Sequence, residues 1–128
     1  MPEIIMKIGE RQKTVPEGHY KAVVLKIEER TRFNKKQLDF TFELKDQNEH
    51  GVILKAFLNA NYESFTSHTK IYRWLAVANK NDLEEGAVFS EKIFYNKVFL
   101  VEVKEKISRK TKNLFCNVTE IVKVLHEI

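Results

Sequence analysis

The alternation of apolar and polar residues over positions 37–45 constrains the fold of this chain more than any other feature. Successive side chains of a β-strand point to opposite faces, so a period of two predicts a strand with one buried face. A polar turn over 46–51 (DQNEHG) and a second apolar run over 52–59 (VILKAFLN) follow, which together predict a β-hairpin. The apolar parity of the first strand is Leu38, Phe40, Phe42 and Leu44, and the polar parity is Gln37, Asp39, Thr41, Glu43 and Lys45.

Lys55 sets the direction of the side chains in the second strand of this hairpin. A lysine rarely points into a core, so alternation divides this strand into an outer and an inner face. The outer face is predicted to hold Ile53, Lys55, Phe57 and Asn59, and the inner face Val52, Leu54, Ala56 and Leu58.

Three more strands and one helix are expected. Residues 19–29 are apolar on both parities, as in a long barrel strand that serves two neighbours, and residues 97–104 and 114–125 are also strand-like. A short extended piece is expected over 87–95, and a helical end over 118–125 stays open as an alternative. A helix with Thr66 and Ser67 as candidate caps is predicted from the spacing of Ile71, Trp74, Leu75 and Ala78.

With 128 residues, the chain is long enough for one hydrophobic core. We expect an N-terminal arm or short leading strand over 1–17 and one domain over 18–128. A single cysteine, Cys116, excludes an intrachain disulfide and is expected to be buried. No apolar run approaches the roughly 18 residues that span a bilayer, and no signal peptide is recognisable, so we expect a cytoplasmic protein without a membrane partner.

The order of the expected elements is three strands, a helix and two strands. This order matches the five-stranded, partly open barrel of the OB-fold, an all-β fold with the helix between strands three and four. In that fold, strands two and three and the loops joining strands one to two and four to five build the ligand face.

Two basic segments coincide with those two loops. Residues 30–36 (RTRFNKK) and 104–112 (KEKISRKTK) hold nine of the 22 lysines and arginines and only one acid, Glu105. Clustered cations of this kind favour binding to a phosphate backbone through counterion release. The cations expected to hold phosphates are Arg30, Arg32, Lys35, Lys36, Lys55, Arg109, Lys110 and Lys112.

Binding of single strands also uses aromatic faces on which bases stack. Phe33, in the first basic segment, is expected to stack on a base, because it has no obvious core to join there. Phe57 and Phe115 are candidates that fit either stacking or burial, and Tyr62 is more typical of a structural residue. Phe40, Phe42 and Trp74 are expected in the core. Asp39 and Glu43 argue against this interface, because the alternation puts their negative charge on the outer face.

The chain resembles a group of phage and prophage proteins of OB-fold type that bind single-stranded DNA. The resemblance covers roughly residues 15–125 and is carried by VPEGHYKAVV, LDFTFEL, FLNANYES, YRWLAVAN and FCNVTEI. It implies a role in replication or recombination, in the host cytoplasm for a phage-encoded protein. Bacterial single-stranded DNA-binding proteins usually end in a flexible acidic tail that recruits partners, whereas this chain ends in VLHEI.

No motif indicates an enzyme. The four glycines are scattered, and the histidines and Cys116 lack metal-ligand spacing, so we expect no catalytic residue, no metal and no cofactor. The expected function is therefore non-enzymatic binding of single-stranded DNA. RNA binding and an OB-fold module that binds a protein partner are the alternatives. A homo-oligomer is compatible with each of these three functions.

Overall fold

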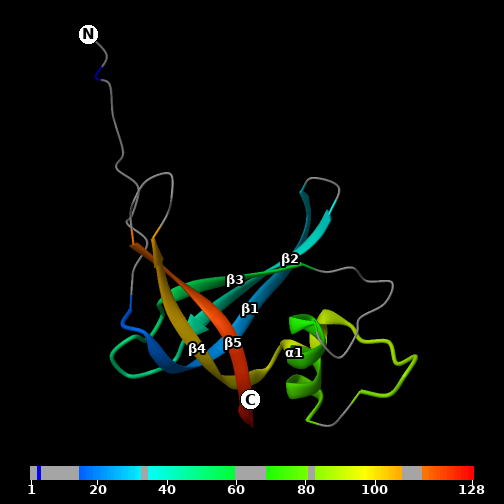
Figure 1. Cartoon of the computed structure of the whole chain (residues 1–128). Coiled ribbons are helices and arrows are strands. Elements are labelled where there is room, and N and C mark those ends of the chain that lie inside the picture. Colours follow the sequence, from blue (N-terminus) through cyan, green and yellow to red (C-terminus); the bar gives the residue numbers. More distant parts are fainter. Residues whose placement is uncertain (1–2, 4–14, 33–34, 60–68, 81–82, 108–113) are drawn as a thin grey trace.

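A computed structural model describes residues 3, 15–32, 35–59, 69–80, 83–107 and 114–128. Five strands, one α-helix and one short 3-10 helix make up this part of the chain (Figure 1). Their bounds are β1 Gly18–Arg32, β2 Lys35–Leu44, β3 Ile53–Asn59, α1 Lys70–Asn79, η1 Glu91–Phe94, β4 Lys97–Ile107 and β5 Leu114–Glu127.

The strands close into a barrel in the order β1-β2-β3-β5-β4, with β4 pairing back to β1. All pairings are antiparallel except that of β3 with β5, which is parallel at Lys55 and Asn117. The helix α1 stands between β3 and β4 in the chain. This is the OB-fold that the element order predicted.

Strand β1 serves two neighbours, as its two apolar parities predicted. Gly18–Ala22 pair with β4, and the strand from Ala22 onward pairs with β2. A register shift between Val24 and Lys26 leaves Leu25 as an extra, exposed residue. An extra residue bends a strand and increases its twist, which allows β1 to leave one neighbour for the other.

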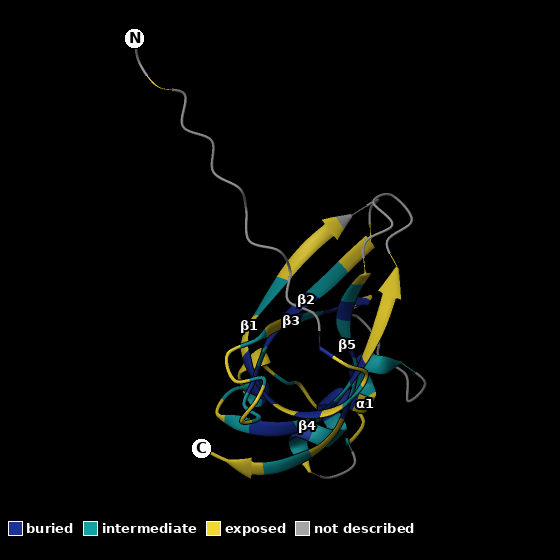
Figure 2. Cartoon of the chain, turned by 90° about the vertical axis from the view of Figure 1, so that its left-hand side faces the viewer, coloured by how far each residue is buried: buried dark blue, intermediate teal, exposed yellow. Residues whose placement is uncertain are grey.

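The core lies inside the barrel and under α1, where buried residues line the inner wall (Figure 2). The predicted core aromatics Phe40, Phe42 and Trp74 are all fully buried. Phe40 packs edge-on against Trp74 and Phe94, with ring centroids 5.1 Å apart in both pairs. Such edge-to-face pairs stabilise a core beyond the area that they bury.

The helix has the predicted apolar face, because Ile71, Trp74, Leu75 and Ala78 are its buried residues. Its N-cap is Thr69, whose hydroxyl accepts a hydrogen bond from the Tyr72 backbone N–H at 3.3 Å. The expected caps Thr66 and Ser67 lie outside the described residues, and the cap is instead Thr69, two residues after Ser67.

Two other expectations need correction. Residues 91–94 form a 3-10 helix instead of extended chain, because the Ser90 hydroxyl caps the Lys92 N–H at 3.2 Å and the turn buries Phe94. The helical alternative for 118–125 is wrong, because β5 pairs with β4 along its whole length. Three register shifts in that pairing break the plain alternation that identifies a strand in sequence.

The end of the expected arm is attached to the barrel. Val15 is buried, and its carbonyl lies 3.2 Å from the Cys116 thiol, which is also buried. The Tyr20 hydroxyl donates to the Pro16 carbonyl at 2.5 Å.

In the described part of the chain, the longest helix is too short and too polar to cross a bilayer.

Candidate nucleic-acid interface

The outer surface of β1, β2 and β3 is the candidate binding face. Backbone pairing places Arg30 of β1 opposite Gln37 of β2, and Asp39 of β2 opposite Phe57 of β3. Paired residues share a face of a sheet, and residues two apart on a strand share it too. Lys55, which pairs with Thr41, therefore belongs to the same face.

These side chains surround a shallow depression of about 330 Å³. Lys55 is half-buried in its wall, and Phe57 leaves 51% of its surface exposed. The inner parity of β3, namely Leu54, Ala56 and Leu58, is buried, so the predicted division of this strand into two faces is confirmed. The depression is lined by Arg30, Gln37, Asp39, Lys55 and Phe57.

Asp39 belongs to the outer face but its side chain is buried, although the alternation predicted an exposed acid there. It is only 3% exposed, because its Oδ2 accepts from the Arg30 Nε at 2.8 Å and its Oδ1 from the Gln37 amide at 2.7 Å. The Arg30 side chain, which is 49% exposed, lies over this carboxylate. The negative charge is thus neutralised by the cation that faces solvent, and it also fixes the guanidinium and the amide in place.

Two other acids of this face are also paired. Glu43, the second acid that argued against the interface, is half-buried and bound to Lys45. Glu28, opposite Asp39, lies 2.9 Å from the Lys26 ammonium, and its hydrogen bond to Lys26 lowers the pKa of Glu28. The sequence prediction had not considered Glu28. Its charge reduces the cationic character of the β1 edge of this face.

The first basic segment is mostly strand, not loop, and this divides its cations between two faces. Lys35, two residues before Gln37, belongs to the same face of the sheet as Gln37, which is the candidate face. Lys36 pairs with Thr31 and belongs to the opposite face of the sheet. Both lysines are exposed. Of Arg32 the structure places the backbone, which pairs with Lys35. Lys36 is therefore not part of the surface that holds Lys55 and Phe57.

The candidate face continues across β5 to β4. Lys55 pairs with Asn117, and Phe115, two residues before Asn117, is half-buried in the same row. Next to them, Lys104 pairs with Asn117 and Lys106 with Phe115. Lys104 and Lys106 are exposed and extend the cationic surface, yet the sequence prediction chose only later residues of this segment. Their alternation with the buried Val101 and Val103 could have identified them.

Both basic hairpins leave the same end of the barrel. The described ends of β1 and β2 rise on one side of β3, and those of β4 and β5 on the other (Figure 1). A view turned by a quarter again shows both pairs at this end, with exposed residues on β1 and β4 (Figure 2). The remaining candidates, Phe33, Arg109, Lys110 and Lys112, lie outside the described residues, as does Tyr62.

No family model matches the chain, and a search of curated proteins finds no match either. Among the described residues, no three histidine, cysteine, aspartate or glutamate side chains are grouped so that they could hold a metal ion. The geometry of the outer face is therefore the basis for assigning a function.

Proposed function

We propose that this protein binds single-stranded DNA without catalysing a reaction, as a cytoplasmic protein of replication or recombination. The observation that carries the proposal is Phe57, a half-exposed aromatic ring beside Lys55 and Arg30 on the ligand face of an OB-fold. A single exposed apolar side chain is common on a protein surface, so the cations beside this ring are what favour a binding role for it. An aromatic ring among cations is the combination that single-strand binding requires.

The depression suits one unstacked base. A base stacked on Phe57 gains roughly 1 to 3 kcal/mol, and stacking tolerates any of the four bases because each has a π-face. In a duplex, both faces of a base are covered by its neighbours. The ring of Phe57 therefore favours single strands over duplex DNA.

Cations on either side of the ring are arranged to follow the phosphates. Lys35 and Arg30 lie toward the β1–β2 hairpin, Lys55 lies beside the ring, and Lys104 and Lys106 lie across β5. A strand that crosses β3 from one hairpin to the other meets these cations in turn. Asp39 keeps the Arg30 guanidinium on this path without presenting its own charge to the phosphates.

The test is a fluorescence-anisotropy titration of a labelled oligothymidine against the full chain at several salt concentrations. Among the described residues, Lys35, Lys55 and Lys106 are the cations of this path that form no ion pair with an acid. If each of these three neutralises one phosphate, the logarithm of the affinity falls with the logarithm of the salt concentration with a slope of about −2.1. An equal-length duplex should bind more weakly. A flat salt response, or tighter binding of the duplex, would contradict the proposal. An oligouridine of equal length decides whether RNA is bound as well.

A further inference from the structure

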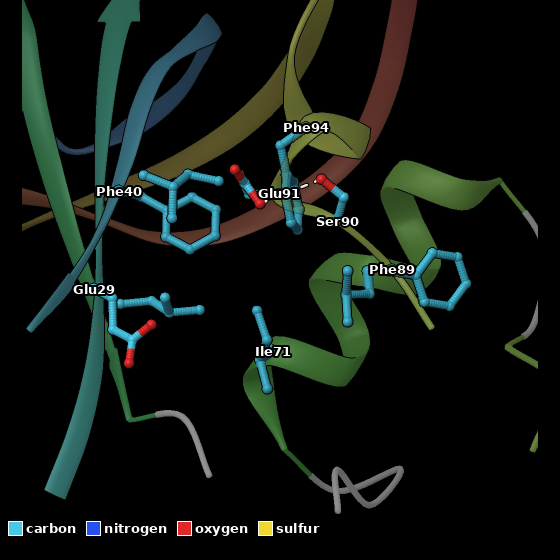
Figure 3. A pocket seen from close by; sticks show the side chains of 10 residues that line it. Glu29, Phe40, Ile71, Phe89, Ser90, Glu91 and Phe94 are labelled. Atoms are coloured by element: carbon cyan, nitrogen blue, oxygen red, sulfur yellow. Dashed lines mark hydrogen bonds between the residues drawn. The ribbon is translucent and has the colours of Figure 1, made fainter. Parts of the chain in front are cut away.

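A second pocket, of about 350 Å³, opens on the opposite side of the β1–β2 hairpin. It lies between the inner row of that hairpin, the helix α1 and the segment that carries η1 (Figure 3). None of the residues that line it lines the depression around Phe57. The two hollows are thus separate sites on one hairpin.

The floor and walls of this pocket are apolar. Phe40, Phe94, Ile71 and Leu75 are buried residues of the core that form one side of the hollow. The rings of Phe40 and Phe94 and the side chain of Ile71 surround the open space in Figure 3. Ile27, Leu38 and Phe89 are only partly buried and complete the walls. An apolar group that enters the pocket is removed from water on several sides, which favours binding.

Two carboxylates stand among these apolar residues. Glu29 comes from β1 and Glu91 from η1, and both side chains are exposed. Glu91 accepts a hydrogen bond from the Ser90 hydroxyl at 3.2 Å. Within the described ranges of the chain, neither carboxylate forms an ion pair. The pocket therefore presents negative charge beside an apolar surface, and no cation among the described residues forms an ion pair with it.

The alternation of β1 places the adjacent residues Glu29 and Arg30 on different sides of the strand. Arg30 lies in the row of the nucleic-acid face, and its neighbour Glu29, which pairs with Leu38, lies in the row of the pocket. The carboxylates of Glu29 and Glu91, which line the pocket, attract a cationic group. The exposed Lys36 lies in the same row as Glu29 but nearer the hairpin tip, and it does not line the pocket.

We propose that this pocket docks a peptide segment of a partner protein in which an apolar side chain is flanked by lysine or arginine. The volume is at the lower end of the range for ligand sites, so it suits one or two inserted side chains better than the face of a whole helix. The apolar side chain enters between Phe40 and Ile71. The flanking cations lie at Glu29 and Glu91, so the strand-binding face stays free while the partner is bound.

The experiment selects peptides from a phage-displayed random heptapeptide library on the immobilised full chain. Sequences that combine an apolar residue with lysine or arginine are the expected result, and their synthetic consensus peptide is then titrated by anisotropy. Selection of acidic sequences, or of none above the bare resin, would overturn the proposal. The same titration is repeated with three variants, after circular dichroism has shown that each one folds.

The variant E29K/E91K should weaken the consensus peptide by about tenfold, because each reversal replaces an attraction with a repulsion of similar size at an exposed site. The control E49K makes a single charge reversal of the same kind in the β2–β3 turn, outside the pocket, and should leave the affinity unchanged. A third variant, K55E, should lose affinity for oligothymidine but keep the peptide. If E29K/E91K leaves the affinity for the peptide unchanged, the docking site is refuted, and this conclusion does not depend on the affinity for oligothymidine.

Discussion

The Arg30 guanidinium lies over the buried carboxylate of Asp39, with Nε 2.8 Å from Oδ2. The two residues come from neighbouring strands, and Gln37 holds the other carboxylate oxygen at 2.7 Å. One acid thereby orients a cation and an amide at the edge of the depression that Phe57 borders. The pair explains how an acidic residue can lie within a surface proposed to bind a polyanion.

Replacement of Arg30 should cost more stability than replacement of Asp39. In R30Q, a nearly buried carboxylate loses its cation, whereas in D39N the half-exposed guanidinium regains water. We expect R30Q to lower the free energy of unfolding by about 1 to 2 kcal/mol and the double variant R30Q/D39N to recover part of it. Urea denaturation of all four proteins measures this. Equal losses in the two single variants, with full additivity, would contradict the pairing.

Removal of the Phe57 ring should weaken strand binding without affecting the fold. F57A should lower the affinity for oligothymidine by about fivefold to a hundredfold, since one stacked base is lost. The stability should change little, because half of the ring is already exposed. I53A is the control, since Ile53 is an exposed apolar residue of the same row on β3. A loss in I53A as large as in F57A would refute a specific role for the ring.

Lys55 should account for one phosphate contact. K55Q should make the salt slope of oligothymidine binding less negative by about 0.7, the share of one neutralised phosphate on a single strand. K123Q serves as the matched control, because Lys123 is an exposed lysine near the other end of β5. Anisotropy titrations at four or more salt concentrations give the slopes. If the two variants shift the slope equally, net charge and not position determines binding.

Thr119 should make part of the stability depend on pH through Glu102. The Thr119 hydroxyl donates to Glu102 Oε1 at 2.9 Å, and this bond lowers the pKa of Glu102 below its ordinary value of 4.5. A carboxyl with a lowered pKa stabilises the folded protein above that ordinary value, and the contribution is lost as the pH falls through the folded pKa. T119V should therefore be less stable than the parent at neutral pH.

The difference between T119V and the parent should be smaller at an acid pH below the folded pKa of Glu102 than at neutral pH, because the carboxyl is then protonated in both states. T119S keeps the hydroxyl and should behave as the parent does. Urea midpoints at the two pH values, together with an NMR titration of the Glu102 carboxyl, test this. An unchanged pKa of Glu102 in T119V would show that the hydroxyl is not its cause.

Trp74 should contribute to the stability of the fold and should not stack on a bound base. Its indole is fully buried, and its N–H donates to Glu120 Oε2 at 3.2 Å, while the Arg73 guanidinium holds Oε1 at 2.9 Å. W74F should lower the free energy of unfolding by about 2 kcal/mol, since a hydrogen bond to a charged group and some packing are lost. Far-UV circular dichroism in urea measures the loss. Affinity for oligothymidine in native buffer should stay unchanged.

The strand faces and the helix face could be predicted because each depends on a local period. Lys55 alone was enough to orient β3, and four apolar positions were enough to orient α1. The helix cap and the 3-10 turn around Ser90 could not be predicted in this way. A cap depends on where the chain turns out of the preceding segment, and short turns carry no period.

The burial of Asp39 is the clearest example of a feature that side-chain alternation in the sequence did not predict. By alternation it belongs to an outer face, and it does lie there. Whether an outer acid is solvated or covered depends on the neighbouring strand, and here Arg30 from β1 covers it. Residue partners across strands follow from pairing register, which one sequence does not specify.

The sequence by itself determined the order of strands and helix along the chain and the concentration of positive charge in two segments, because these are properties of consecutive residues. Only the tertiary structure decided which cations share a face with Phe57, and that Glu29 and Arg30 serve opposite sides of one strand. The physical reason is that register and barrel closure join residues far apart in the chain, and side-chain alternation then separates neighbours onto different surfaces.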